Sequence, residues 1–457
     1  MIKIITDFLH NTSLHGCKNI PEQSRSKINR IIWMLVVLTF VCILWVSVVG
    51  LYQEVVKYKT LSTTKFEHRS FLEFPSITIC TQPYDTSKLN LSQAREFEEF
   101  MVEKGVWNTL KNPKATNLSD VNITLATSLS PPFDIKDVFL EITWNLKRLD
   151  PSSYLQPVST RDPECVGFNT KGTNETFISS SIGIYTGLRI LANIHQDRVL
   201  AGPIPSSSIE VFIHTPSTSF YRLNKGILVA PGTSTSITMN THEYTFLPYP
   251  HKITEDEYCI DTSLDKNKDY NRLSCRVSWV EDRVKEICNC TFGDTTSECD
   301  VQKVITCFNP QFSDYFTKSE NSSLTKCPRP CRFVIYDTKT SFSYFPSDSM
   351  SRYLVRNGII DSVDYARQNL LELYINFEDM VVWKTESIAE YNTMSILGSL
   401  GGHMGLFVGA SMITVVELLE TLVFFFIAFA VRMGRPRIVE PAILTKTSMS
   451  KKDENLS

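Results

Sequence analysis

The chain has 457 residues, a formal net charge of −3 and 21% charged residues. This length allows several domains at about 150 residues each, and nothing in the charge indicates nucleic-acid binding. The mean hydropathy of −0.08 is that of a soluble protein. That average conceals two concentrated apolar segments, and these decide the class of protein.

The first apolar segment runs from Ile31 to Leu51 without a charged residue. As a helix it would extend roughly 30 Å, the thickness of a bilayer's hydrocarbon core. A secretory signal peptide has an apolar core of only about 7–15 residues near the N-terminus and an Ala-x-Ala-like cleavage site. This segment is longer, starts later and lacks such a site, so it predicts a transmembrane helix over residues 31–51.

The second apolar segment runs from Leu406 to Val431, with Glu417 and Glu420 as its only charges. Its length exceeds a straight span, which predicts a tilted or broken helix. With the small residues that precede it, this pore-lining helix is assigned to residues 396–431. The sequence between the two segments contains no third candidate of comparable length.

Basic residues flank both segments, and such residues favour the cytoplasmic side of a membrane. They are Lys18, Arg25, Lys27 and Arg30 before the first segment, and Arg432, Arg435 and Arg437 after the second. We therefore expect a multi-pass plasma-membrane protein in contact with lipid. Residues 1–30 and 432–457 would be cytoplasmic and residues 52–395 extracellular.

Ten of the twelve cysteines fall in the predicted extracellular domain, as a disulfide framework in an oxidising compartment requires. Eight of these ten lie between residues 259 and 331. Zinc at Cys288-x-Cys290 is the alternative, which an extracellular location disfavours. Cys17 is expected to be a reduced thiol rather than a palmitoylation site. Six glycosylation triplets support the topology weakly; they start at Asn90, Asn117, Asn122, Asn174, Asn289 and Asn321.

Apolar and polar residues alternate in several stretches, which predicts strands. Residues 74–80 follow the first span and residues 371–377 precede the second, so we expect these two strands to pair and to couple the extracellular domain to the membrane. Further strands are expected at 187–194, 209–215 and 236–246, with helices at about 276–288 and 298–308. Residues 85–125 are polar and read as helix and loop.

Glu417 and Glu420 are the sharpest functional signal in the sequence. A carboxylate in the bilayer is costly unless it faces water or a partner. Three residues apart, the two side chains lie on one face of a helix, which favours a pore-facing position. The alternative places both near the inner headgroups, where the cost shrinks.

Small residues precede the two glutamates, from Gly398 to Gly405 and again at Gly409-Ala410-Ser411. Glycine exposes carbonyl groups where a helix unwinds, and such carbonyls above a ring of carboxylates suit a narrow pore. A Gly-x-x-x-Gly packing face over residues 401, 405 and 409 is equally compatible. The spacing does not choose between them.

Motifs of common enzymes are missing from the sequence. It contains no His-Glu-x-x-His, Gly-x-Ser-x-Gly, phosphate-binding loop or dinucleotide fingerprint, and its eight histidines are scattered. We therefore expect no catalytic residue, no bound metal and no cofactor.

Three stretches resemble the degenerin/epithelial sodium channel superfamily, which includes acid-sensing and peptide-gated channels. They are the His-Gly motif at His15-Gly16, the Phe-Pro-Ser-Ile-Thr-Ile-Cys run at residues 74–80, and the segment from Gly401 through Ser411 to Glu417. The cysteine spacing from 259 to 331 also fits, so the resemblance covers residues 12–435. The pore and cysteine patterns are specific, whereas His-Gly alone is weak.

The resemblance implies an α+β membrane protein that forms trimers, homomeric or with other subunits of the family. Each subunit would carry two transmembrane helices below a disulfide-rich palm, β-ball, knuckle, finger (about 85–130) and thumb (about 259–331). The implied bridges are Cys80–Cys165, Cys259–Cys331, Cys275–Cys327, Cys288–Cys307 and Cys290–Cys299.

By the same resemblance, Gly409-Ala410-Ser411 forms the narrow belt and His15-Gly16 shapes the inner mouth. Gly398 and Ser399 belong to the gate, and Gly405 aligns with a residue lining the amiloride site. Sodium would then be the permeant ion, shedding part of its hydration to oxygen ligands while Glu417 concentrates cations.

The gating stimulus is the least constrained expectation. Titratable groups of acid-sensing relatives align with neutral residues here, at Ser217, Thr218, Asn309, Ser313 and Thr60, and neutral groups cannot titrate between pH 7 and 5. Our hypothesis is opening by an extracellular ligand such as a neuropeptide. A proton-gated or constitutively active member of the same superfamily is the alternative.

Two other classes of membrane protein fit the sequence less well. A two-pass adhesion or scavenger receptor would not need paired glutamates in its second span. An ATP-gated channel would need Lys-x-Lys together with Asn-Phe-Arg, and the extracellular sequence contains no Asn-Phe-Arg triplet.

Overall fold

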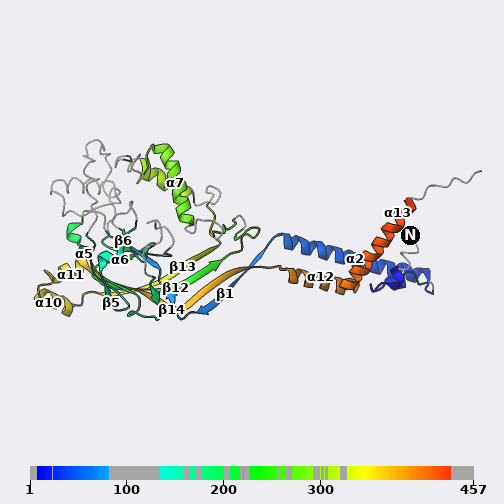
Figure 1. Cartoon of the computed structure of the whole chain (residues 1–457), viewed down its shortest axis with the longest axis horizontal. Helices are drawn as coiled ribbons and strands as arrows, with labels where there is room; N and C mark the ends of the chain where they lie inside the picture. Colours follow the sequence, from blue (N-terminus) through cyan, green and yellow to red (C-terminus); the bar gives the residue numbers. More distant parts are fainter. Residues whose placement is uncertain are drawn as a thin grey trace, which may run out of the picture. The chain divides into compact units, whose positions relative to one another are not determined.

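The structure is a computed structural model, and it divides into two compact units: residues 1–59 with 390–457, and residues 60–389. Its elements can be followed in Figure 1. The structure describes residues 8–22, 24–81, 134–158, 165–170, 176–199, 206–216, 220, 226–254, 257–262, 270–291, 299, 303, 307–319 and 327–433. The predicted finger, at about 85–130, lies outside these ranges.

The first unit contains one long apolar helix, α2 (Lys27–Val56), which extends beyond the predicted span at both ends. It buries no residue inside the unit, as expected of a helix whose apolar surface faces lipid. Within the described part of the chain, α2 is the one helix that by itself is long and apolar enough to cross a membrane.

The predicted second span is broken into α12 (Thr393–Val408) and α13 (Met412–Met433). The two helices pass the length and hydropathy test only as a pair, and they are bent by 77° at the break. The excess length of this segment is thus taken up by a sharp bend, which is one of the two outcomes that the sequence predicted.

The second unit is built on a seven-stranded sheet in the order β13-β12-β14-β9-β4-β5, with β1 paired to β14. Its strands are β1 (Thr60–His68), β4 (Phe139–Trp144), β5 (Lys147–Leu149), β9 (Leu188–Asn193), β12 (Thr233–Thr245), β13 (Arg332–Tyr344) and β14 (Leu370–Ala389). β12 and β14 run parallel, with an irregularity between Met239 and Thr241, and the other pairs are antiparallel.

A five-stranded sheet in the order β11-β10-β3-β7-β6 faces a shared core with the first sheet. Its strands are β3 (Ser76–Cys80), β6 (Leu155–Pro157), β7 (Cys165–Phe168), β10 (Ile209–His214) and β11 (Ile227–Val229). Two further short strands, β2 (Leu72–Glu73) and β8 (Ile178–Ser179), pair with each other.

The expected pairing of strands 74–80 and 371–377 is wrong. Both stretches are strands, but β3 pairs with β7 and β10, whereas residues 371–377 of β14 pair with β9 and β12. The strand β1 pairs with the later part of β14, from Val381 to Ala389. The physical reason is burial. Every residue of β3 is buried, so it is a central strand of the second sheet, while β1 is mostly exposed and shows no apolar alternation that could mark it in the sequence.

The core between the two sheets is rich in aromatic and branched side chains. Phe74, which precedes β3, packs edge to face against Trp144 at a ring distance of 4.6 Å and against Phe377 at 5.9 Å. The four alternating apolar residues of the predicted strand at 371–377 all join this core. The three expected strands at 187–194, 209–215 and 236–246 correspond to β9, β10 and β12.

Residues 259–331 contain α7 (Arg272–Cys288) and α9 (Asn309–Lys318), which pack on a small second core around Val280 and Val284. α7 begins four residues before its predicted start, and the predicted helix at 298–308 lies mostly outside the described residues. The five bridges are the pairs that the resemblance implied: Cys80–Cys165, Cys259–Cys331, Cys275–Cys327, Cys288–Cys307 and Cys290–Cys299.

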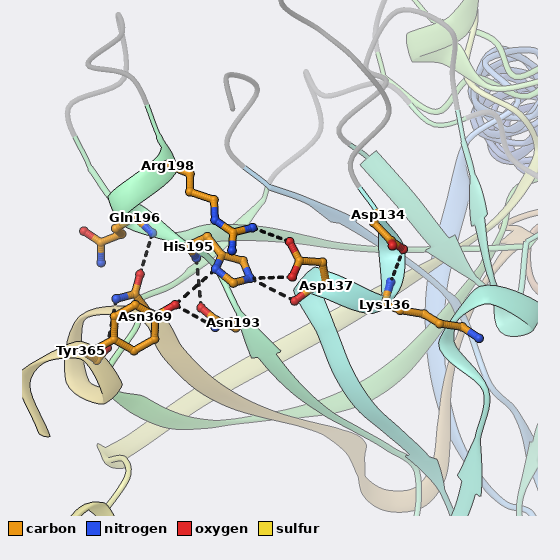
Figure 2. Close-up of polar contacts among 9 residues, drawn as sticks. All are labelled: Asp134, Lys136, Asp137, Asn193, His195, Gln196, Arg198, Tyr365 and Asn369. Atoms are coloured by element: carbon orange, nitrogen blue, oxygen red, sulfur yellow. Dashed lines mark hydrogen bonds and ion pairs between the residues drawn. The ribbon is translucent and has the colours of Figure 1, made fainter. Parts of the chain in front are cut away.

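The remaining short helices are α5 (Ile135–Val138), α6 (Pro151–Tyr154), α10 (Asp348–Arg356) and α11 (Val363–Asn369). Figure 2 shows how polar side chains join α5, α11 and the end of β9. His195 has a left-handed backbone, and its ring nitrogens lie 3.4 Å from an Asp137 carboxylate oxygen and 3.3 Å from the Tyr365 hydroxyl. Arg198 also pairs with Asp137, at 2.6 Å, and the Asn193 amide donates to the Tyr365 hydroxyl.

Candidate ion pathway

The break between α12 and α13 is encoded by Gly409 and Ser411. Gly409 ends α12 in a left-handed conformation, with φ at 62°, which glycine adopts without strain. Two residues later, the Ser411 hydroxyl accepts the Thr414 N–H at 3.4 Å and the Thr414 hydroxyl accepts the Ser411 N–H at 3.0 Å. This reciprocal capping starts a new helix, so residues 409–411 are held as non-helical backbone between two helix ends.

The N-terminal segment around the His-Gly motif packs directly on this break. The His15 backbone N–H donates to the Val408 carbonyl at 3.1 Å, and the His15 ring lies so close to Gly409 that a Cβ there would overlap it. Gly16, with φ at 82°, lies against Trp33 and Val37 of α2. The motif therefore connects the end of α12 to the first helix.

Ser13 reaches the start of α13 from the same segment. Its hydroxyl lies 2.6 Å from the Thr414 hydroxyl and donates to a Glu417 carboxylate oxygen at 3.3 Å, while its backbone N–H lies 3.4 Å from the same oxygen. Glu417 is half-buried beneath this contact. Its carboxylate is thereby held within two helical turns of the non-helical backbone.

Glu420 lies in a different environment from Glu417. Its side chain is exposed and makes no hydrogen bond or ion pair with any residue that the structure describes. The expectation that both glutamates lie on one helical face fits their positions on α13, but only Glu417 is tied to the N-terminal segment.

The predicted gate and amiloride-site residues Gly398, Ser399 and Gly405 all lie on α12. A Cβ built on Gly398, Gly401, Gly402 or Gly405 would meet nothing within 4 Å. Of the Gly-x-x-x-Gly series, only Gly409 is in close contact, and its neighbour is the His15 ring. Among the described residues, none therefore packs against the glycine face of α12.

The predicted acid-sensing positions are only partly described. Thr60 starts β1, and Asn309 and Ser313 lie on α9. Ser217 and Thr218 are outside the described residues, as are the glycosylation triplets at Asn90, Asn117, Asn122, Asn174 and Asn321. Asn289 is described and follows the end of α7 in a left-handed conformation. Within the described residues, no cluster of side chains suited to a metal ion is found.

Sequence reasoning assigned no role to Ser13, which precedes the His-Gly motif, and did not identify Thr414; the two join the His-Gly segment to the start of α13. One signal was available, because Ser411-x-x-Thr414 has the spacing of a capping pair and marks a helix start inside an apolar run. The contact of Ser13 with residues about four hundred positions away had no local signal.

Comparisons with known proteins show the family of the chain. The amiloride-sensitive sodium channel family matches residues 8–421. A bile acid-sensitive ion channel from Homo sapiens is 27% identical over 91% of this chain and 85% of its own length. Acid-sensing ion channel 1A from Danio rerio and acid-sensing ion channel 1 from Gallus gallus are each 26% identical over 91% of this chain, covering 87% and 83% of those proteins.

A solved structure of a proton-activated chloride channel covers 86% of this chain and 98% of its own, with 8% identity and a TM-score of 0.31. That likeness is too low to carry an argument. The match over residues 8–421, by contrast, includes the His-Gly segment, both apolar segments up to residue 421 and the whole cysteine pattern. The chain belongs to the amiloride-sensitive sodium channel family, within the degenerin/epithelial sodium channel superfamily, and is therefore a cation-channel protein and not an enzyme.

Proposed function

We propose that this chain is one subunit of a trimeric, sodium-preferring channel in the plasma membrane, with both termini in the cytoplasm. The observation that carries the proposal is the break at Gly409-Ala410-Ser411. It places non-helical backbone in an apolar segment, beside the His-Gly motif and above the Glu417 carboxylate. Irregular backbone at membrane depth is tolerated where it is buried in protein or lines a water-filled path.

In the trimer, three copies of residues 409–411 would narrow the path, and their backbone oxygens would replace part of the hydration shell of sodium. Three Glu417 carboxylates would raise the local cation concentration below this belt. The open glycine face of α12 leaves room for amiloride near Gly405 and for movement of the gate at Gly398 and Ser399. His15 and Gly16 would shape the inner mouth.

We further propose that an extracellular ligand opens the channel, with a neuropeptide as the first candidate. Asn309, Ser313 and Thr60 are neutral, so they cannot supply the titrating groups expected of an acid sensor. A second candidate is an amphipathic organic anion, because two of the compared relatives, from Homo sapiens and Rattus norvegicus, are bile acid-sensitive channels. The subunits can be identical or drawn from the same family.

The conducting role is tested by replacing Glu417 with Gln and, as a matched control, Glu420 with Gln. Each variant is expressed in oocytes, alone and with candidate relatives. Current is recorded during application of amidated peptides, a bile salt or acid, with and without amiloride. We expect Glu417→Gln to lower sodium conductance severalfold and Glu420→Gln to have a smaller effect, because only Glu417 is fixed beside the break.

Two results would contradict the proposal. If Glu417→Gln, together with a bulky replacement of Ser411, leaves both conductance and sodium preference unchanged at equal surface delivery, the ion path lies elsewhere. Large currents evoked by pH 5 alone, without peptide or bile salt, would contradict ligand gating while leaving the conducting role intact.

A further inference from the structure

Two hydroxyl groups, those of Thr414 and Ser13, connect the break in the second apolar segment to the Glu417 carboxylate. The Thr414 hydroxyl accepts the Ser411 backbone N–H at 3.0 Å. It lies 2.6 Å from the Ser13 hydroxyl, which in turn lies 3.3 Å from the Oε2 atom of Glu417. All four residues belong to the same compact unit. Hydrogen bonds thus run without interruption from the backbone of residue 411 to a carboxylate.

The direction of this chain of hydrogen bonds follows from what each group can donate. A carboxylate can only accept hydrogen bonds, so the Ser13 hydroxyl donates to Glu417. Ser13 has then used its single hydroxyl proton, and its contact with the Thr414 hydroxyl requires Thr414 to donate to Ser13. Thr414 can do so because it accepts at its contact with the Ser411 N–H. Every donor therefore points toward Glu417, and hydrogen bonds aligned in this way strengthen one another.

Ser13 contacts one oxygen of the Glu417 carboxylate and not the other. Its backbone N–H lies 3.4 Å and its hydroxyl 3.3 Å from the same atom, Oε2. Among the residues that the structure describes, none forms a hydrogen bond or ion pair with the second oxygen, Oε1. Because Oε2 is held from one side, the carboxylate has a restricted orientation. Oε1 keeps its lone pairs available for a cation.

The backbone around Ser13 is held in place independently of the Ser13 side chain. The Thr12 side chain is buried, and its hydroxyl accepts the Leu14 backbone N–H at 3.3 Å. On the other side of Ser13, the His15 backbone N–H donates to the Val408 carbonyl at 3.1 Å. Removal of the Ser13 hydroxyl should therefore leave this segment against the break.

The partners of Ser13 on α13 lie on one face of that helix. Thr414 and Glu417 are three residues apart, which brings their side chains together. Thr414 is 3% exposed, so its hydroxyl needs a partner inside the protein. Ser13 therefore has two separable effects: it satisfies a buried hydroxyl, which is structural, and it orients a carboxylate.

We propose that Ser13 is a positioning residue for cation selection. It holds Oε2 of Glu417, leaves Oε1 for the permeant cation, and connects the carboxylate to the backbone at Ser411. Without the hydroxyl, the carboxylate keeps only the N–H contact at 3.4 Å, and its orientation is no longer fixed. The inference rests on the proposed function in one respect, namely that Glu417 faces the ion path.

The test compares Ser13→Ala with the conservative variant Ser13→Thr, which keeps a hydroxyl. Asn11→Ala is the control, at an exposed residue of the same segment. The full-length variants are expressed in oocytes, and current is evoked by the same mixture of amidated peptides and taurocholate. Reversal potentials in sodium and potassium solutions give the permeability ratio, which does not depend on how many channels open. Surface biotinylation is measured in the same cells.

We expect Ser13→Ala to lower the sodium-to-potassium permeability ratio roughly threefold, the size of one lost hydrogen bond. Ser13→Thr and Asn11→Ala should keep the wild-type ratio. A second comparison uses a Glu417→Ala background, which has no carboxylate to orient. There, Ser13→Ala should leave the ratio unchanged, whereas a purely structural role in satisfying Thr414 would lower it again.

The inference is wrong if Ser13→Ala keeps the wild-type ratio, if Ser13→Thr behaves as Ser13→Ala does, or if Ser13→Ala has the same effect in the Glu417→Ala background. These outcomes are distinct from a failure of the proposed function. If Glu417→Gln lowers sodium conductance and Ser13→Ala changes nothing, the inference about Ser13 alone is contradicted. If Glu417→Gln also has no effect, the assignment of the ion path is contradicted.

Discussion

The cysteine-rich region at residues 259–331 and the break at residues 409–411 both connect helices that share little apolar core, and they do so by different means. In the cysteine-rich region, four disulfides connect the chain around a core that includes Val280 and Val284. At the break, a few hydrogen bonds and one close backbone contact connect residues 13–16 to the ends of α12 and α13.

This difference has a physical consequence. A disulfide restricts the unfolded chain and does not open under native conditions, whereas a single hydrogen bond contributes only about 0.5–1.5 kcal/mol and can exchange rapidly. We therefore expect the described helices α7 and α9 to keep their mutual packing, and the break at residues 409–411 to rearrange more readily.

The largest effect is expected from disturbing the contact between Gly409 and the His15 ring, because this contact holds the noncovalent break together. In Gly409→Ala, the added Cβ would overlap the His15 ring, and the alanine would have to keep a φ of 62°, which strains a residue with a side chain. We expect at least a tenfold loss of current at unchanged surface delivery, because both the belt and the inner segment must shift. Current and surface biotinylation are measured together in the same oocytes.

Gly402→Ala is the matched control, since a Cβ at Gly402 meets nothing within 4 Å. It makes the same change in the same apolar segment and should leave current within about twofold. Equal currents in the two variants would show that the contact between His15 and Gly409 does not matter for conduction.

A second prediction concerns the disulfide bridges between residues 259 and 331. The Cys275–Cys327 bridge closes a separation of 52 residues, whereas Cys290–Cys299 closes only 9. In the chain-entropy account, removing the longer bridge costs about 1.5 kcal/mol more stability than removing the shorter one. Both pairs are changed to Ser, and thermal unfolding of the purified full-length protein is followed at equal concentration. Equal losses in the two variants would contradict the entropic explanation.

The elements that the sequence predicted well are those whose burial leaves a local pattern. The alternation at residues 371–377 marked β14, and the uncharged run at residues 31–51 marked α2. β1 and much of β13 are exposed, so their strands leave no apolar period and were missed. The pairing of β1 with β14 depends on residues more than three hundred positions apart, which no local rule supplies.

The candidate site shows the same limit. Gly409, Ser411 and Glu417 could be named because glycine, a capping residue and an intramembrane carboxylate each have intrinsic physical meaning. The contact of Ser13 with Glu417 could not, since a serine near a terminus is common and only the fold brings it to α13.

The smallest expected effect concerns a noncovalent contact inside the disulfide-tied domain. The His214 ring lies 2.9 Å from the Thr78 hydroxyl, and burial lowers the pKa of this histidine below its usual value. His214 therefore binds a proton in the unfolded chain at a pH at which it stays neutral in the folded chain. The contribution of His214 to the free energy of unfolding is fully present above about pH 6.5 and falls as the pH drops below that value.

His214→Gln removes this titration. The free energy of unfolding should then decrease less between pH 7 and pH 5 than in the wild type, by a difference of less than about 2 kcal/mol. Thermal unfolding of the full-length protein across this range measures the slope, and His251→Gln is the comparison at a histidine outside both sheets. If His214→Gln keeps the wild-type slope, another group causes the acid sensitivity. If it also changes the response of the current to ligand, the ectodomain is less rigid than its disulfides imply.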